Sequence, residues 1–385
     1  VKLPLKPGAT PVRHQAPRMS VDGRRWLEQY TANLEKHGVI KRERFSPWAS
    51  RVVLVKKKDG QYRCAIDFRD VNRMLLPIDV PMPRPDQTLV SMSEGLFGMP
   101  LPDDLPDSER EIIAKGGHGP KYFCAFDLAS GFHGIKIAEE SQPILTFCTP
   151  TQRYRYTRLP FGLQLSPAIM TSVMSEVLHG LNRIASWYVD DVLTWGRTFE
   201  EMLERCEIVL VRLIKANLTL KASKCNLFAL ETEFLGHVIS RYGVSLNPSR
   251  VDAINQIDPA AINNLTALRS FLGATGYYRK HVRGYADLAR PLIDLTRKGC
   301  DVALLSQQEP AQKAINDLKR ALTTAPVLAL PQWHKQFEVH TDASVTGIGA
   351  VLVQRDDNGD PHPVEFYGRT LTPPETRYSV TELEL

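Results

Sequence analysis

The sequence has 385 residues, of which 43% are hydrophobic and 24% charged, which is typical of an intracellular globular protein of two or three domains. No apolar run approaches the roughly 20 residues of a membrane span, and six widely spaced cysteines without a CxxC pair argue against a zinc site or a secreted disulfide framework. The net charge of +5 is uneven, because residues 1–72 carry sixteen Lys and Arg against seven Asp and Glu, which favours a polyanionic partner.

The first predicted element is a helix over about 22–38. Trp26, Tyr30 and Leu34 are spaced four apart on one face, and Gly38 is expected to end the helix.

The sequence begins with Val and stops at "TELEL", within a pattern typical of an amphipathic helix. We therefore expect it to be a piece of a longer protein.

A β-hairpin is predicted next, with strands over 52–55 and 62–68 and a turn at Asp59-Gly60. Lys56, Lys57 and Lys58 fall at its tip. The proline-rich stretch 75–86 is incompatible with a regular element. Residues 99–120, rich in Pro, Gly and acids, are interpreted as an exposed insertion with one short helical segment, "DSEREIIAK".

A strand ending in Asp127 follows, with a turn at Ser130-Gly131. The segment "LPFGLQLSPAIMTSVMSEVLHGL" predicts a loop and a helix, with Ser166 as the N-cap, Pro167 at the first helical position and Gly180 after the end. Strands thus alternate with helices around a sheet that must contain both Asp127 and the later "DD" pair.

The remaining elements are a long amphipathic helix over 199–220 and a short strand, "EFLGHVIS", over 233–240. A largely helical region is predicted over about 247–325. From residue 337 the pattern returns to β, with two strands joined by an Asn358-Gly359 turn.

Two adjacent carboxylates, Asp190 and Asp191, stand inside the apolar run "WYVDDVLTW". A tight turn is one interpretation, because Asp is common in turns. The other is a metal site: if the two strands are neighbours, Asp127 joins the pair, and three carboxylates without nearby His or Cys favour Mg²⁺ or Mn²⁺. Two such ions about 4 Å apart would suit phosphoryl transfer, and Lys57 and Arg63 on the hairpin could neutralise a triphosphate.

Several motifs stand in the order found in the reverse transcriptases of long-terminal-repeat retroelements, especially of the gypsy type. "CAFDLASGFHGIKI", "LPFGLQLSPA", "WYVDDVL" and "FLGHVIS" resemble the palm of that family. "SPWASRVVLVKKKDGQYRCAIDFRDVN" resembles its fingers and "LRSFLGATGYYRKHVRGYADLARPL" its thumb. The similarity covers nearly the whole chain apart from the insertion at about 99–120.

The resemblance implies an α+β right-hand polymerase, with fingers and palm over 1–245, a thumb or connection over 246–325 and a truncated ribonuclease H-like segment over 326–385. It implies that Asp127, Asp190 and Asp191 form a catalytic triad binding two Mg²⁺ ions, with the Leu128 carbonyl as a further ligand. The other roles carried over are nucleotide binding by Lys57, Arg63, Phe132, Phe161 and Gly162, and primer binding by Phe234, Leu235, Gly236 and His237. Phe132 would exclude a ribose 2′-hydroxyl. Lys221 or Lys224 would donate a proton to the leaving pyrophosphate.

In the ribonuclease H-like segment, the resemblance makes Asp342 the first metal ligand and Glu384 the second. That nuclease needs two further carboxylates, so we do not expect this segment to cleave RNA by itself.

The resulting hypothesis is an RNA- and DNA-templated DNA polymerase. Its partners would be a template with a primer, deoxynucleoside triphosphates, and the protease and integrase segments of a parent polyprotein, in a cytoplasmic particle or the nucleus. A catalytically inactive retroelement relic that only binds nucleic acid is the alternative. An RNA polymerase with a related palm is disfavoured by Phe132.

Overall fold

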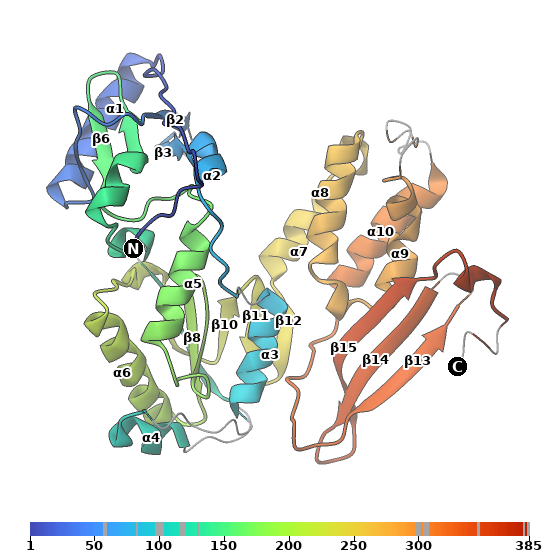
Figure 1. Cartoon of the computed structure of the whole chain (residues 1–385). Helices are drawn as coiled ribbons and strands as arrows, with labels where there is room; N and C mark the ends of the chain where they lie inside the picture. Colours follow the sequence, from blue (N-terminus) through green and yellow to red (C-terminus); the bar gives the residue numbers. More distant parts are fainter. Residues whose placement is uncertain are drawn as a thin grey trace.

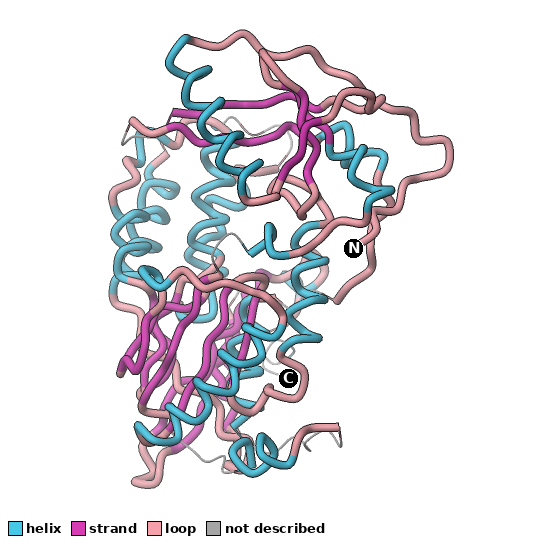
Figure 2. Tube along the Cα trace, turned by 90° about the vertical axis from the view of Figure 1, so that its left-hand side faces the viewer, coloured by secondary structure: helices cyan, strands magenta, loops and turns pink. Residues whose placement is uncertain are grey.

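The computed structural model describes all residues except 57–59, 82–83, 97–103, 115–119, 129–130, 298–299, 301, 303–307, 345–346, 380–381 and 383–385. Figure 1 shows two masses side by side. The first part of the chain forms the left mass, with one body above another, and the later helices and the C-terminal sheet form the right mass. Figure 2, seen from the left side of Figure 1, shows one group of strands in the upper part and another in the lower part.

The upper left body contains a helix and a five-stranded sheet. Helix α1 (Val21–Lys36) begins at the N-cap Ser20, whose hydroxyl accepts a hydrogen bond from the Gly23 amide. The sheet order is β1-β6-β5-β2-β3. Its strands are β1 (Ile40–Arg42), β2 (Ser50–Lys56), β3 (Tyr62–Asp67), β5 (Thr146–Cys148) and β6 (Arg153–Tyr156). Helix α2 (Arg69–Met74) follows β3 in the chain. The predicted helix and hairpin are confirmed. Of the predicted turn, Asp59 lies outside the described residues and Gly60 has a φ of 82°.

The lower left body is built on a four-stranded sheet of order β7-β8-β4-β9. Its strands are β4 (Tyr122–Asp127), β7 (Ala185–Tyr188), β8 (Asp191–Gly196) and β9 (Asn226–Ala229). Helices α5 (Ser166–Val177) and α6 (Phe199–Lys215) pack near it, and short 3₁₀ turns η1 (Gly131–Gly134), η2 (Glu139–Leu145) and η3 (Ala222–Lys224) connect the strands. One continuous apolar core joins the upper and lower bodies.

The N-terminus of α5 differs from the prediction. Ser166 is the first helical residue and not the N-cap, which is Leu165. The Ser166 hydroxyl donates to the Pro160 carbonyl 2.8 Å away, so it is engaged with the preceding loop instead of with the free amides of the helix.

The segment between the upper body and β4 also differs from the prediction. Helix α3 (Pro85–Leu96) was not predicted, and it packs against β7. Helix α4 (Asp107–Ala114) was predicted, but it is not simply exposed. Ile113 is fully buried, and Glu109 forms an ion pair with Arg212 of α6. The described part of the predicted insertion is therefore packed onto the body.

A small three-stranded sheet, β10-β11-β12, links the left mass to the right. Its strands are β10 (Glu231–Phe234), β11 (His237–Ser240) and β12 (Gly243–Leu246). The prediction of a single strand over 233–240 is wrong, because this segment is a hairpin. Leu235 and Gly236 form its two-residue turn with φ of 49° and 74°, the positive values that match the twist of the paired strands.

The right mass combines helices with a second sheet. The helices are α7 (Pro248–Asn255), α8 (Leu265–Gly276), α9 (Tyr285–Asp294) and α10 (Glu309–Thr323), with 3₁₀ turns η4 (Pro259–Ala261) and η5 (Arg279–His281). The sheet has three strands, β13 (Glu338–Ala343), β14 (Gly347–Arg355) and β15 (Pro361–Thr370), where two were predicted, and the turn η7 (Glu375–Arg377) follows. Helix α9 packs against β15. Among the described residues no helix is long and apolar enough to cross a membrane.

Candidate active site

The register of two neighbouring strands brings the predicted carboxylates together. Strand β4 pairs antiparallel with β8 so that Asp127 lies opposite Asp191. Asp190 occupies the turn between β7 and β8, and its carbonyl accepts a hydrogen bond from the Leu128 amide at 3.3 Å. Residues more than 60 positions apart in the sequence therefore meet at one end of the sheet.

The turn that presents Asp190 is strained. Val189 has a φ of 55°, in the left-handed region that β-branched residues rarely adopt. The surrounding pairs, including Tyr188 opposite Asp191, hold this conformation. Such strain costs of order 1–3 kcal/mol and persists only where the flanking structure enforces it, which is common at functional sites.

The electrostatics of the site show carboxylates that repel one another. Burial, reinforced by the charges of Asp190 and Asp127, raises the pKa of Asp191 to about 6. Burial and the Asp127 charge also raise the pKa of Asp190. Both shifts mean that negative charge is incompletely compensated here, which a bound cation would relieve.

One lysine partly compensates this charge. The Nζ atom of Lys224 lies 2.8 Å from Oδ2 of Asp127. Lys221 reaches Asp127 only through the backbone, where its amide donates to the Asp127 carbonyl at 2.9 Å. Of the two lysines that sequence reasoning left open, Lys224 is the one whose side chain contacts Asp127.

The aspartates fit a hard divalent ion in donor type. Carboxylate oxygens and a backbone carbonyl such as that of Leu128 are the ligands that Mg²⁺ and Mn²⁺ prefer. In the described part of the chain, no group of three or more His, Cys, Asp or Glu side chains is already arranged to hold a metal ion. The side chains would have to close around an ion, and the ammonium of Lys224 would have to yield its place on Asp127.

Two predicted nucleotide-binding residues contact each other. The rings of Phe132 and Phe161 meet edge to face with centroids 5.0 Å apart, and Phe161 is half exposed. Gly162 has a φ of 92°, and its carbonyl accepts a hydrogen bond from the Asn72 side chain of α2. Asn72 also accepts from the Gln164 amide, so it holds this loop against the upper body. Sequence reasoning missed Asn72, whose role depends on a contact 90 residues away.

The predicted triphosphate contacts are only partly described. Lys57 lies outside the described residues. Arg63 is exposed on β3, an edge strand of its sheet. Nothing in the described contacts joins Arg63 to the aspartates.

The predicted primer-binding residues divide into two pairs. Phe234 and His237 are buried, with 4% and 6% of their surface exposed, so their side chains serve the core. Leu235 and Gly236 form the turn, and the hydroxyls of Tyr277 and Tyr278, in the segment that follows α8, donate to their carbonyls. Leu235 and Gly236 are the more exposed pair, and the two tyrosines fix the position of this turn.

In the C-terminal sheet, Asp342 is exposed on β13, whereas Glu384 lies outside the described residues. The two predicted nuclease ligands are therefore not brought together among the described residues.

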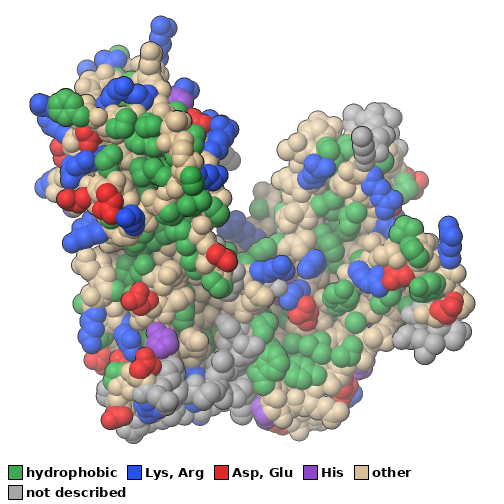
Figure 3. Space-filling model, viewed as in Figure 1, with side chains coloured by type: hydrophobic (Ala, Val, Ile, Leu, Met, Phe, Trp, Pro, Cys, Tyr) green, Lys and Arg blue, Asp and Glu red, His purple; other side chains and the backbone are tan. Residues whose placement is uncertain are grey.

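Figure 3 shows that the left and right masses are separated by a notch, and that Lys and Arg side chains gather where the masses meet below it.

Comparisons with known proteins agree with this arrangement. The family "Reverse transcriptase (RNA-dependent DNA polymerase)" matches residues 55–239, which contain all three aspartates. The family "RNase H-like domain found in reverse transcriptase" matches residues 308–385. The chain belongs to the reverse transcriptases of gypsy-type retroelement Pol polyproteins.

Among curated relatives, the Pol polyproteins of the transposons opus, 297 and gypsy, all from Drosophila melanogaster, are 32%, 34% and 31% identical to this chain. The matches cover 93%, 93% and 91% of this chain but only 34%, 31% and 32% of the relatives. The chain thus spans about a third of the curated relatives it matches.

Solved structures share the fold. A foamy viral protease-reverse transcriptase in complex with double-stranded DNA has a TM-score of 0.81 at 23% identity, covering 97% of this chain and 60% of that one. The same viral enzyme with an RNA/DNA hybrid gives a TM-score of 0.75 at 23% identity, covering 97% and 46%. The predicted α+β right-hand fold with a ribonuclease H-like segment is confirmed.

Proposed function

We propose that this chain is an RNA- and DNA-templated DNA polymerase that transfers nucleotides to a primer 3′-hydroxyl at Asp127, Asp190 and Asp191. The observation that carries the proposal is the register of β4 and β8, which sets Asp127 opposite Asp191 beside the turn that holds Asp190. The ends of the carboxylate-bearing strands lie in the part of the chain that matches the reverse-transcriptase family.

In this proposal the three carboxylates, with the Leu128 carbonyl, hold two Mg²⁺ ions, for which Mn²⁺ is a substitute. When bound there, such ions would supply activation of the attacking hydroxyl and stabilisation of the charge on the leaving pyrophosphate. Phe132 and Phe161 pack edge to face. We assign them the nucleotide pocket, with the bulk of Phe132 excluding a 2′-hydroxyl. Lys224, within reach of Asp127, is assigned to donate a proton to pyrophosphate.

We place the template and primer in the notch between the two masses (Figure 3). The basic side chains there would bind phosphates, so affinity should fall steeply with salt. The foamy viral enzyme that shares this fold was solved with double-stranded DNA and with an RNA/DNA hybrid, which supports a nucleic-acid duplex as the ligand. We assign the left mass, 1–245, to fingers and palm, 246–325 to the thumb and 326–385 to the ribonuclease H-like segment.

The deciding experiment is primer extension on a ribonucleotide template with Mg²⁺, comparing the wild type with Asp190→Asn. This variant keeps the shape of the side chain and removes its charge. We expect extension to fall about 100-fold or more in the variant, because a group that stabilises charge in the transition state is lost, while template-primer binding is retained. Deoxynucleotides should be incorporated in strong preference to ribonucleotides.

Two results would contradict the proposal. Template-primer binding without extension in either protein would identify an inactive, nucleic-acid-binding relic. Equal incorporation of ribonucleotides and deoxynucleotides would identify an RNA polymerase. The buried Ile113 and the Glu109–Arg212 ion pair favour an active enzyme over a decayed one, since the inserted segment is packed into the body.

A further inference from the structure

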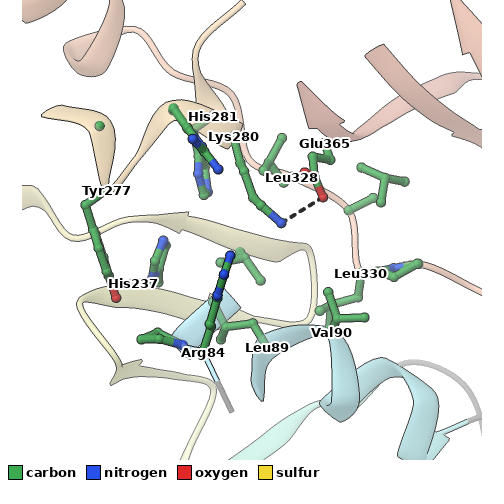
Figure 4. Close-up of a pocket in the computed structure, with 17 residues that line it drawn as sticks. Arg84, Leu89, Val90, His237, Tyr277, Lys280, His281, Leu328, Leu330 and Glu365 are labelled. Carbon is green, nitrogen blue, oxygen red and sulfur yellow. Dashed lines mark hydrogen bonds and ion pairs between the residues drawn. The ribbon is translucent and has the colours of Figure 1, made fainter. Parts of the chain in front are cut away.

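A cavity of about 310 Å³ lies away from the aspartates, where three parts of the molecule meet (Figure 4). Helix α3 and the residue before it, Arg84, form its floor. The β10–β12 sheet and the turn η5 form one side, and the segment 328–331 with strand β15 forms the other. The three aspartates and the residues assigned to nucleotide binding do not line this cavity, whereas His237, predicted to bind the primer, does.

Most of the wall is apolar. Figure 4 shows Leu89 and Val90 of α3 facing Leu328 and Leu330 across the space. A volume of this size is at the lower end of the range for small-molecule sites, which are typically apolar with a few polar groups. It holds roughly ten to fifteen non-hydrogen atoms, given about 30 Å³ per water in the liquid.

A buried histidine in the wall is poorly hydrogen-bonded, with the Val244 backbone as its one potential hydrogen-bond partner among the described residues. His281 is only 4% exposed, and neither of its ring nitrogens makes a hydrogen bond of normal geometry with the described residues. Its ring stacks on that of His237, with centroids 5.2 Å apart, and Figure 4 shows the two rings pointing toward each other. Burial, with the nearby His237, lowers the pKa of His281 to about 3, so the ring is neutral near pH 7.

A neutral imidazole carries one donor and one acceptor. The Val244 backbone can engage at most one of them, and a nitrogen left unsatisfied in a buried site costs free energy and calls for a specific explanation. A ligand in the cavity that hydrogen-bonds to His281 supplies one.

The charges at the mouth of the cavity leave an excess of cations. Lys280 is balanced by Glu365 of β15 at 3.0 Å. Arg84 is exposed, and Figure 4 shows its side chain rising from the floor into the space below Lys280. Within the described part of the chain no acidic side chain pairs with Arg84, and Arg279 is a second arginine of the lining.

We propose that this cavity binds a small amphipathic anion, with a flat apolar body against the Leu and Val side chains and a single carboxylate directed at Arg84 and His281. The apolar wall would contact the body of the ligand, and the excess of cations would attract its charge. The poorly hydrogen-bonded His281 ring would offer the carboxylate a hydrogen bond. Because its walls come from the palm, the thumb and β15, an occupant contacts all three and stabilises their arrangement. The proposal does not depend on the proposed polymerase chemistry, although the cavity adjoins the predicted primer-binding hairpin through His237.

The test uses naphthalene-2-carboxylate and its neutral amide, naphthalene-2-carboxamide, which has nearly the same shape. Binding to the whole chain is measured by isothermal titration calorimetry, with the shift in thermal unfolding as a second readout. We expect one saturable site for the carboxylate and weaker binding of the amide. Arg84→Gln, a change at an exposed position, should weaken the carboxylate about tenfold and leave the amide unchanged.

Three further variants complete the test. Val90→Phe fills the cavity and should abolish binding of both compounds, while His281→Phe keeps a stacked ring, removes both nitrogens and should weaken the carboxylate several-fold. Arg24→Gln, at an exposed position on α1, is the control and should change nothing. The proposal is overturned if the wild type shows no saturable binding, if the two compounds bind equally, or if neither Arg84→Gln nor Val90→Phe weakens the carboxylate.

Discussion

Replacing Lys224 with Met should strengthen divalent-ion binding by the aspartates in the absence of nucleic acid. The ammonium of Lys224 lies 2.8 Å from Oδ2 of Asp127 and would compete with an ion for that oxygen. Met keeps most of the aliphatic side chain and removes the charge. The prediction rests on the proposed metal site.

The magnitude follows from the exposure of the pair. Two unit charges 2.8 Å apart attract by about 1.5 kcal/mol at the dielectric constant of water. Lys224 is 55% exposed and Asp127 25% exposed, and exposed ion pairs contribute only about 0–1 kcal/mol after screening and side-chain ordering. A release of about 0.5–1 kcal/mol corresponds to about two- to fivefold tighter binding.

The assay is titration of the protein with Mn²⁺, with free Mn²⁺ measured by electron paramagnetic resonance. Lys221→Met is the matched control, because Lys221 contacts Asp127 only through its backbone amide and should leave the affinity unchanged. The difference between the Lys224 variant and the wild type should shrink at high salt. Unchanged or weaker Mn²⁺ binding by Lys224→Met, or an equal effect of Lys221→Met, would refute the reasoning.

Three further predictions concern stability. Arg205→Ala should lower the free energy of unfolding in urea by about 3 kcal/mol, because it leaves the buried Glu201 carboxylate with less compensation; a loss below about 1 kcal/mol contradicts this. Gly243→Ala should lower the thermal midpoint, since φ is 130° and a Cβ would lie 2.0 Å from a backbone oxygen; an unchanged midpoint contradicts it. The hydrogen bonds from Arg69 lower the pKa of Asp67 to about 2. The wild type should therefore be more stable than Asp67→Asn above about pH 4 and lose that advantage as pH falls toward 2. Urea titrations across pH measure the difference, and a pH-independent difference contradicts the prediction.

Elements with a local signal were predictable from the sequence. The four-residue spacing of Trp26, Tyr30 and Leu34 places α1, and the Asp59-Gly60 pair between apolar runs places the β2–β3 hairpin. These patterns arise from backbone geometry within a few residues, so distant contacts were not needed to find them.

Elements that depend on distant contacts were missed. Helix α3 begins at Pro85, inside a proline-rich stretch, and its packing against β7 sustains it. The turn at Leu235 lacks the usual Asn-Gly signal, and the hydroxyls of Tyr277 and Tyr278, 42 residues later, hold its carbonyls. A single apolar run was therefore interpreted as one strand.

The candidate site shows the same division. The motifs marked Asp127, Asp190 and Asp191, but their meeting depends on the strand register, and the contact between Lys224 and Asp127 depends on how η3 follows the sheet. The burial of Phe234 and His237 likewise required the tertiary structure, because an apolar or aromatic residue in a motif can serve either the core or a ligand.

The packing of α9 on β15 has a mechanical consequence. Together with the Lys280–Glu365 ion pair, this packing holds the helices α7–α10 directly against the C-terminal sheet. If these helices rotate relative to the aspartates, we therefore expect the sheet to move with them. The β10–β12 sheet connects this unit to the part of the chain that carries the aspartates, so we expect any such rotation to bend the molecule there.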